Sequence, residues 1–195
     1  MIAIIDYNAG NIRSVENALS RLGCEFVLTA DPALIRSADK VILPGLGNAA
    51  EAMRSLQEKG LIPVLKALRK PVLGICVGLQ VICRDSEEGP CECIGLFDAH
   101  VRRFPSDPIA KVPHMGWNAL GNLDGKLFRD LKGGAYVYFV HSYYPTLGPD
   151  TIATCRHGDT LFSAALKYEN FYGTQFHPEK SGAVGEQILR NFLSL

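Results

Sequence analysis

The chain has 195 residues, of which 47% are apolar and 21% are charged, and its formal net charge is zero. This composition is typical of a globular protein and excludes a disordered chain, a collagen-like repeat and strong electrostatic attraction to nucleic acid or an acidic membrane. The first residues lack the basic start and long apolar run of a signal peptide, and no segment approaches the length of a membrane span. We therefore expect a single cytoplasmic domain over residues 1–195, with no membrane or nucleic-acid partner.

Strand and helix patterns alternate over the first 80 residues. Asn11 is placed to cap the first helix and Gly23 to end it. Such alternation predicts an α/β fold with a mainly parallel sheet between helices, in which functional sites lie at the carboxyl ends of the strands. The predicted strands are 3–7, 25–29, 40–44 and 72–75, and the predicted helices are 12–22 and 49–69, the latter interrupted at Gly60 and Pro63.

From about Gly95 onward, short strands follow one another with few long helices between them. We expect these strands to extend the central sheet by antiparallel or mixed pairing. The chain then ends in a helix over 183–193 whose apolar face, with Ile188 and Phe192, should cover the sheet. The predicted strands of this half are 97–104, 111–117, 136–144, 151–157, 162–168 and 171–177.

The six cysteines are dispersed through a chain that is large enough to fold without disulfide bonds, so we expect reduced thiols. Cys91 and Cys93 lie beside acidic residues, a pattern also found in metal sites. No second Cys or His pair follows at zinc spacing, however, and the sequence predicts no bound metal. Cys24, Cys83 and Cys155 are interpreted as packing residues.

Cys76 lies in the pentad GICVG, directly after the predicted strand 72–75. This is the sequence form of a nucleophile elbow, a sharp strand-to-helix turn whose glycines leave room for strained backbone. A thiol at this turn lies near the N-terminus of the next helix, which favours the reactive thiolate. The alternative interpretation is that Cys76 is a small buried core residue.

A base for this thiol is predicted in the segment GTQFHPEKSG. His177 ends an apolar strand and Glu179 follows two residues later, so both side chains project to one side of an extended backbone. Pro178 between them prevents regular sheet pairing. Together with Cys76 these residues predict a Cys-His-Glu relay that activates the thiol. A surface turn is the alternative for His177 and Glu179.

Acyl chemistry at the cysteine also requires donors for the negative charge that develops on the substrate oxygen. The backbone amide of Val77, the first helical residue after the nucleophile, is one candidate. The second is the peptide of Leu46, because the segment PGLG leaves a neighbouring strand and Gly45 and Gly47 give that peptide freedom to rotate. The alternative is an ordinary strand-to-helix turn.

The segments KVILPGLG, VLGICVGLQ and GTQFHPEKSG, in this order, resemble the class I glutamine amidotransferases. That resemblance implies a flavodoxin-like fold with a mixed sheet flanked by helices. Three further segments, DYNAGNIRSV, PHMGWN and FVHSYY, are similar to those of the glutaminase subunits of imidazole glycerol phosphate synthases. The resemblance covers essentially the whole chain.

The resemblance assigns roles to individual residues. It implies that Cys76 attacks the side-chain amide of L-glutamine, that His177 transfers protons and that Glu179 orients the histidine, so that ammonia and glutamate are released. No cofactor is implied. The oxyanion contacts would come from Val77, Leu46 and Gly47, and the substrate contacts from Gly45, Gln80, Ser142 and Tyr143.

The sequence has no P-loop and no GxGxxG motif, so a site for the ammonia acceptor is expected on another chain. The resemblance identifies that partner as a TIM-barrel cyclase in a heterodimer, which makes imidazole glycerol phosphate and an aminoimidazole carboxamide ribotide in histidine biosynthesis. Met115, Trp117 and Asn118 have a composition suited to the interface, with core packing as the alternative for Trp117. Asn11 and Lys180 are similar to family residues that line the ammonia exit.

Three other functions remain open on the sequence alone: a stand-alone cysteine hydrolase, a non-catalytic binding subunit, and an amidotransferase that feeds a different synthase. No function is predicted for the acidic stretch 87–93. Because the peptide of Leu46 can rotate, we also hypothesise that the oxyanion site is completed only when the partner binds.

Overall fold

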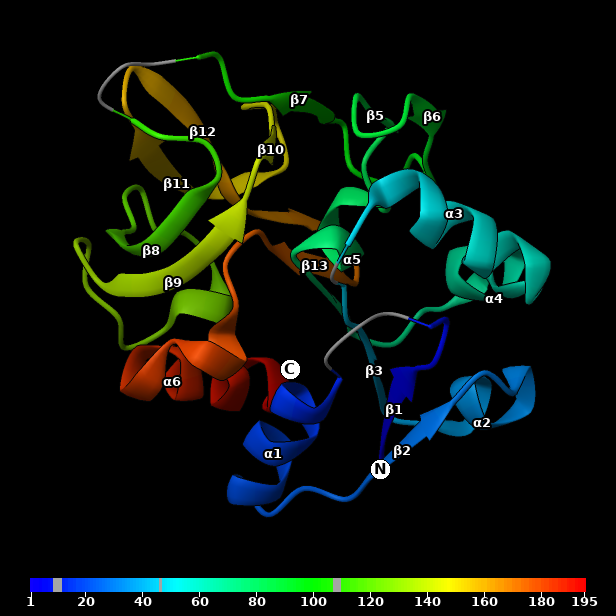
Figure 1. The fold of residues 1–195 in the computed structure, drawn as a ribbon. Coiled ribbons are helices and arrows are strands. Elements are labelled where there is room, and N and C mark those ends of the chain that lie inside the picture. Colours follow the sequence, from blue (N-terminus) through cyan, green and yellow to red (C-terminus); the bar gives the residue numbers. More distant parts are fainter. Residues whose placement is uncertain (9–11, 46, 107–109) are drawn as a thin grey trace.

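The computed structural model describes residues 1–8, 12–45, 47–106 and 110–195 (Figure 1). In this part of the chain a central sheet of seven strands has the order β11-β12-β13-β4-β3-β1-β2. The strands from β13 to β2 pair in parallel, and β12 and β11 add antiparallel at one edge. Its strands are β1 (Ile2–Ile5), β2 (Phe26–Thr29), β3 (Lys40–Leu43), β4 (Val72–Ile75), β11 (Thr151–His157), β12 (Thr160–Tyr168) and β13 (Phe171–Thr174).

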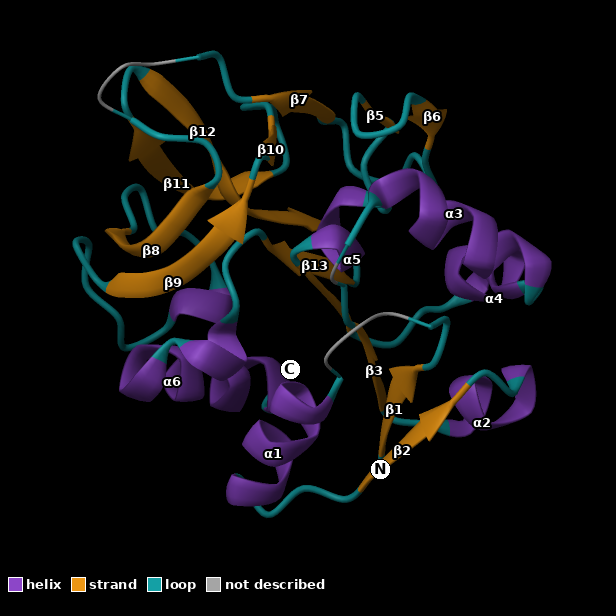
Figure 2. Cartoon of the chain, in the orientation of Figure 1, coloured by secondary structure: helices purple, strands orange, loops and turns teal. Residues whose placement is uncertain are grey.

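Helices lie on both sides of this sheet (Figure 2). On one side are α1 (Arg13–Arg21) and α6 (Gly182–Leu193), and on the other are α2 (Pro32–Ser37), α3 (Ala49–Glu58) and α4 (Leu61–Ala67). Every residue of β1, β4 and β13 is buried, as expected for apolar strands that are covered on both faces. The predicted mixed, mainly parallel α/β fold is confirmed.

The alternation predicted for the first half is confirmed with two differences. The break between α3 and α4 occurs at Gly60, which has a φ of 64°, whereas Pro63 lies inside the first turn of α4, where no intrahelical N–H bond is lost. Helix α2 was not predicted; Asp31 caps it by accepting a hydrogen bond from the amide of Ala33. The predicted cap Asn11 lies outside the described residues.

The second half differs more from the prediction. Only β11, β12 and β13 join the central sheet, and the expectation that the other segments extend it is wrong. They form two smaller sheets, because a pattern of apolar residues sets which faces are buried but not which strand is the partner. One sheet contains β10 (Tyr143–Pro145), β7 (His100–Arg103), β5 (Asp85–Ser86) and β6 (Cys91–Glu92), and the other contains β8 (His114–Ala119) and β9 (Tyr136–His141).

Three short elements complete the described part of the chain. Helix α5 (Val77–Gln80) follows β4, a 3₁₀ turn η1 (Lys126–Phe128) precedes β9, and a second 3₁₀ turn η2 (Pro178–Lys180) leads into α6. The chain passes from β9 to β10 at Ser142, so the predicted continuous strand 136–144 is broken there. This break brings the end of β9 close to the start of α5.

Candidate active site

Cys76 connects β4 to α5 in a strained turn. Its φ of 54° and ψ of −112° are conformations that residues other than glycine rarely adopt. A Cβ on Gly78 would lie 1.9 Å from the carbonyl oxygen of Leu43, and one on Gly74 would lie 2.6 Å from the carbonyl oxygen of Gly78. The predicted elbow geometry and its need for flanking glycines are therefore confirmed.

The loop after β3 packs against this elbow. A Cβ on Gly45 would lie 2.2 Å from the amide nitrogen of Gly78, so only glycine permits this approach. Gly47 has a φ of 99° and reaches the cavity beside Cys76. The hydroxyl of Tyr7 donates a hydrogen bond to the carbonyl of Pro44 and tethers the loop to the end of β1. Leu46 lies outside the described residues.

His177 and Glu179 form a buried pair beside the cysteine. His177 Nδ1 lies 2.7 Å from Glu179 Oε1, and the carboxylate side chain is only 4% exposed. Burial acts to lower the pKa of His177, but the charge of Cys76, followed by the hydrogen bond and charge of Glu179, outweighs it and raises the pKa to about 10. The surroundings therefore favour the imidazolium form of His177.

Two polar groups contact the sulfur of Cys76. Gln175 Nε2 donates to the sulfur at 3.6 Å, and the carbonyl oxygen of Val140 lies 3.9 Å away. Gln175 is fully buried and projects on the same side of the chain as His177, two residues later. Sequence reasoning missed this residue, although a glutamine within an otherwise apolar strand was a usable signal.

A cavity of about 230 Å³ opens in front of Cys76. Val77 is the first residue of α5, so its N–H has no acceptor within the helix. Gln80 is buried, and its Oε1 has no hydrogen-bond partner among the described residues. Gly45, by contrast, packs behind the elbow. The cavity is lined by Gly47, Cys76, Val77, Gln80, Glu88, Pro113, Val140, His141, Ser142 and Tyr143.

Glu88 brings a carboxylate to this cavity and was not predicted as a site residue. Its Oε2 accepts a hydrogen bond from the amide of Ala49 at the start of α3, at 3.2 Å. Partial burial raises the pKa of Glu88, while the hydrogen bond from Ala49 acts in the opposite direction. Glu88 lies in a turn without a recognisable motif, so no local pattern indicates this placement.

A chain of buried hydrogen bonds connects the cavity to β8. His141 Nδ1 lies 2.7 Å from the carbonyl oxygen of Tyr143, and His141 Nε2 lies 3.0 Å from His114 Nδ1. Asn118 Nδ2 lies 3.1 Å from His114 Nε2. This pattern is satisfied when both rings are neutral: His141 donates to Tyr143, His114 donates to His141, and Asn118 donates to His114. Burial lowers the pKa of His141 to about 3 and that of His114 to about 4.

The opposite face of β8 is exposed. Met115 and Trp117 are 62% and 55% exposed, and the exposed Tyr136 lies on the same face of the paired strand β9, opposite Ala119. Core packing of Trp117, the alternative considered from the sequence, is therefore wrong. Asn118 projects to the other face, into the histidine pair, and so does not lie with Met115 and Trp117.

The ring of Trp117 lies over the start of α6, within 3.8 Å of the position that a Cβ on Gly182 would occupy. Lys180 belongs to η2, directly before this point, and is half-buried. Along the chain, Lys180 lies between His177 and Gly182, the residue that the ring of Trp117 approaches. Asn11, the other residue expected at the ammonia exit, lies outside the described residues.

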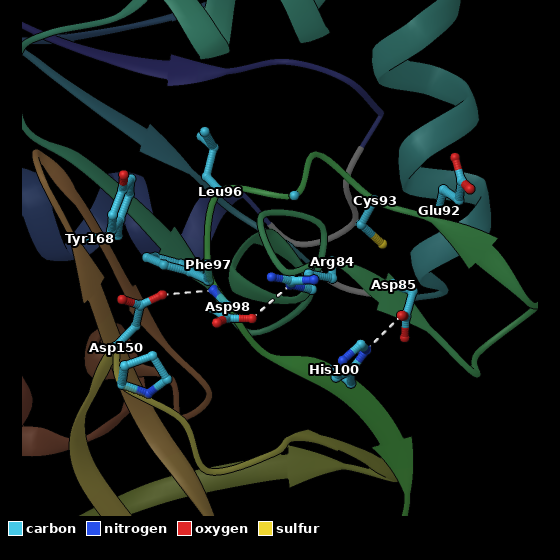
Figure 3. A pocket seen from close by; sticks show the side chains of 12 residues that line it. Arg84, Asp85, Glu92, Cys93, Leu96, Phe97, Asp98, His100, Asp150 and Tyr168 are labelled. Atoms are coloured by element: carbon cyan, nitrogen blue, oxygen red, sulfur yellow. Dashed lines mark hydrogen bonds and ion pairs between the residues drawn. The ribbon is translucent and has the colours of Figure 1, made fainter.

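A second cavity of about 730 Å³ lies beside β5, β6 and β7 and shares no lining residue with the first (Figure 3). Two charged pairs line it: Arg84 Nε lies 2.7 Å from Asp98 Oδ1, and His100 Nδ1 lies 2.6 Å from Asp85 Oδ2. Cys93 borders this cavity, and burial raises the pKa of its thiol. These surroundings do not favour Cys93 as a nucleophile.

No group of three or more His, Cys, Asp or Glu side chains is arranged to hold a metal ion within the described ranges. The helices formed by these residues are also too short or too polar to span a bilayer.

Comparison with known proteins gives a consistent result. The model of the class I glutamine amidotransferase family matches residues 3–195. The imidazole glycerol phosphate synthase subunit HisH of Bacteroides thetaiotaomicron is 53% identical over 195 residues, covering 100% of this chain and 99% of the relative. The subunit HisH of Vibrio cholerae is 43% identical over 201 residues, covering 100% and 98%.

Solved structures have the same fold at lower sequence identity. A protein of Thermoplasma acidophilum, assigned to GMP synthase as one of its subunits, has a TM-score of 0.75 at 24% identity and covers 99% of this chain and 92% of its own. A glutamine amidotransferase of Thermotoga maritima has a TM-score of 0.63 at 18% identity, with coverages of 99% and 82%.

Proposed function

The chain belongs to the class I glutamine amidotransferases, and within them to the HisH subunits of imidazole glycerol phosphate synthase, and from that premise we propose how its residues hydrolyse glutamine. Cys76 is the nucleophile, His177 the proton-transfer group and Glu179 the residue that orients the imidazole. The observation that carries this proposal is the strained Cys76 at a small cavity, with a buried His177–Glu179 pair beside it.

In the first step the thiolate of Cys76 attacks the side-chain carbonyl carbon of glutamine and forms a carbon–sulfur bond. His177 gives its proton to the amide nitrogen, the carbon–nitrogen bond breaks, and ammonia leaves. In the second step His177 takes a proton from water, the resulting hydroxide attacks the thioester, and glutamate leaves as the carbon–sulfur bond breaks. Glutamine and water are thereby converted to glutamate and ammonia.

The tetrahedral intermediates carry negative charge on the former carbonyl oxygen, and backbone amides stabilise it. We assign the first donor to Val77, whose N–H lies at the N-terminus of α5 and at the cavity wall. The second donor is assigned to the peptide between Leu46 and Gly47. The positive φ of Gly47 and its position at the cavity support this assignment.

The remaining groups of the cavity are assigned to the amino-acid end of the substrate. The carboxylate of Glu88 binds the α-ammonium group, since it is the acidic side chain among the lining residues. Ser142 and Tyr143 bind from the opposite wall, and Gln80 Oε1 accepts a hydrogen bond from the substrate. Gly45 contributes indirectly, by allowing the loop after β3 to approach the elbow.

Ammonia released at Cys76 is passed to a TIM-barrel cyclase in a heterodimer, which produces imidazole glycerol phosphate and an aminoimidazole carboxamide ribotide. The names of the relatives support membership of a multi-subunit synthase. The docking surface is the exposed face that Met115, Trp117 and Tyr136 form, and Lys180 and Asn11 line the ammonia exit. Residues 1–195 form one amidotransferase domain that acts in the cytoplasm.

The experiment that tests this function compares the wild-type chain with Cys76→Ala, each mixed with the cyclase subunit. The variant should bind the cyclase with unchanged affinity and support synthesis from added ammonium salt, but glutamine-dependent synthesis should fall to background. Glutamine hydrolysis that survives in Cys76→Ala would contradict the assignment of the nucleophile. Loss of synthesis from added ammonium salt would contradict the proposal that this chain supplies ammonia and the cyclase uses it.

A further inference from the structure

A chain of side-chain hydrogen bonds ends on the sulfur of Cys76. Gln80 Nε2 donates to the carbonyl oxygen of Tyr143 at 3.0 Å and to Gln175 Oε1 at 2.9 Å. Gln175 Nε2 donates in turn to Cys76 Sγ at 3.6 Å. Both glutamine side chains are buried, so these bonds are shielded from water.

The direction of each bond follows from the backbone. A carbonyl oxygen can only accept, so the carbonyl of Tyr143 requires the NH₂ group of Gln80, not its oxygen, on that side. The second hydrogen of this NH₂ group is then directed to Gln175 Oε1. With its oxygen committed to Gln80, Gln175 must present its own NH₂ group to Cys76. His141 Nδ1 holds the carbonyl of Tyr143 from the other side, at 2.7 Å.

We propose that Gln175 stabilises the thiolate of Cys76 through this N–H donor, and that Gln80 acts as a positioning residue that holds Gln175 in the donating orientation. The proposal rests on Cys76 being the nucleophile of the proposed function. A hydrogen bond to an ionised acceptor is about twice as strong as one between neutral groups, so the bond favours the thiolate over the thiol. Burial makes the donor important, because Cys76 is only 3% exposed and most of its surface is solvated by protein groups instead of water.

The other groups near the sulfur do not replace this donor. His177 contributes a positive charge, as its raised pKa indicates. The hydroxyl of Tyr7 donates to the carbonyl of Pro44, and burial, followed by the charge of Cys76, raises the pKa of Tyr7, so this side chain stays neutral. The carbonyl of Val140 accepts a hydrogen bond from the thiol and favours the neutral form. Gln175 opposes the effect of that carbonyl.

The test is the rate at which iodoacetamide alkylates Cys76, followed by mass spectrometry of the Cys76 peptide between pH 5 and 10. Only the thiolate reacts, and glutamine is not needed. In Gln175→Met, which has a similar volume but no N–H donor, the half-maximal rate should occur about one pH unit higher, and alkylation at pH values well below the wild-type midpoint should fall by about ten-fold. Gln175→Glu should show a larger shift, because a carboxylate repels the thiolate.

Gln187→Met is the matched control, because Gln187 lies in α6 and its amide is bonded to Asn191, away from the cavity. Its alkylation profile should equal that of the wild-type chain. At high pH, where all Cys76 is ionised, Gln175→Met and the wild-type chain should react at the same rate. This comparison distinguishes a smaller fraction of thiolate from a change in the access of iodoacetamide to Cys76. An unchanged midpoint in Gln175→Met would overturn the proposal.

Gln80→Met provides a second variant, in which Gln175 keeps its side chain but loses the partner that orients it. A smaller shift in the same direction is expected, and no shift would overturn the role of Gln80.

A second measurement is available if Gln175→Met does not fold. The NMR signals of the side-chain amide protons of Gln175 in the wild-type chain should then shift as Cys76 ionises, and unchanged signals would overturn the proposal. Glutamine hydrolysis that persists in Cys76→Ala would defeat the proposed function instead, so the two failures are distinguishable.

Discussion

In the proposed mechanism Glu179 acts on Cys76 only through His177, and the buried bond of 2.7 Å between Glu179 and His177 makes this role measurable. Replacing Glu179 by Gln removes one of the interactions that raise the pKa of His177, so the imidazolium should lose its proton at lower pH than in the wild-type chain. An NMR titration of the His177 ring should show this lower midpoint. Glutamine hydrolysis should fall by about 10² or more, since the imidazole also loses the group that orients it.

Cys76→Ala is the control for this titration. Because Cys76 raises the pKa of His177 more than Glu179 does, its removal should lower the midpoint further than Glu179→Gln does. Equal midpoints in the Glu179→Gln and wild-type chains would contradict the assigned role of the carboxylate.

The residues of the site differ in how far they could be predicted. Cys76, His177 and Glu179 could be read from short motifs, because the elbow and the proline between histidine and glutamate leave a local pattern. Gln175 and Glu88 act through contacts with residues that are distant in sequence, Gln80 and Ala49. A glutamine in an otherwise apolar segment marks Gln175 as unusual but does not reveal its partner, and no local pattern marks Glu88, so only the folded chain shows these contacts.

At the scale of elements, the elbow depends on the close approach of β3 and α5. A methyl group on Gly78 would lie 1.9 Å from the carbonyl oxygen of Leu43, which is fixed by the sheet. We expect Gly78→Ala to lower the free energy of unfolding by about 2 kcal/mol or more, because one of the two elements must move. Gly133→Ala, where no atom lies within 4 Å, should change it by less than about 1 kcal/mol. Urea unfolding measures both, and equal effects would contradict this account.

The two buried histidines that join β8 to β9 should make the protein sensitive to acid. In the unfolded chain a histidine binds a proton near pH 6.5, whereas His141 and His114 stay neutral in the fold until the pH falls to about 3 and about 4. Unfolding therefore takes up protons below pH 6.5, and the free energy of unfolding decreases as the pH falls. For His141 alone the loss should reach about 3 kcal/mol at pH 4.

Denaturant unfolding between pH 4 and 7 measures this slope. His114→Gln should have a shallower slope than the wild-type chain, because it removes one of the two histidines whose pKa burial lowers. A free energy of unfolding that stays constant between pH 4 and 7 would contradict the statement that His114 and His141 are neutral in the folded chain.

The strand and helix pattern predicted the parallel half of the sheet well, because strands without polar residues, such as β4, are stable only when helices cover both faces of the sheet. It did not predict that β8 and β9 form a sheet of their own. Their residues alternate between exposed and buried, which fits any antiparallel neighbour. The helix α2 was missed because it has only six residues.

At the scale of the whole molecule, the exposed face of β8 and β9 and the loop at Gly47 lead to one prediction about the complex. If docking of the cyclase turns the peptide between Leu46 and Gly47 into its oxyanion-binding orientation, the cyclase should raise glutamine turnover. Equal turnover with and without the cyclase would contradict this hypothesis. Trp117→Ala should weaken docking by about ten-fold or more and so require more cyclase for half-maximal turnover. Tyr168→Ala, which replaces an exposed aromatic residue of β12, is the control and should leave that requirement unchanged.

The side chains of strand β9 alternate between the outer surface of the small sheet and the core with its cavity. Tyr136 faces outward on the same side as Trp117, whereas Phe139 and His141 face the core and the cavity. Substitutions at Tyr136 therefore leave the groups that line the cavity in place. Under the proposed function, the docking surface could change together with its partner while Cys76 and its neighbours stay the same, and the protein could be adapted to a new acceptor enzyme at such outward positions.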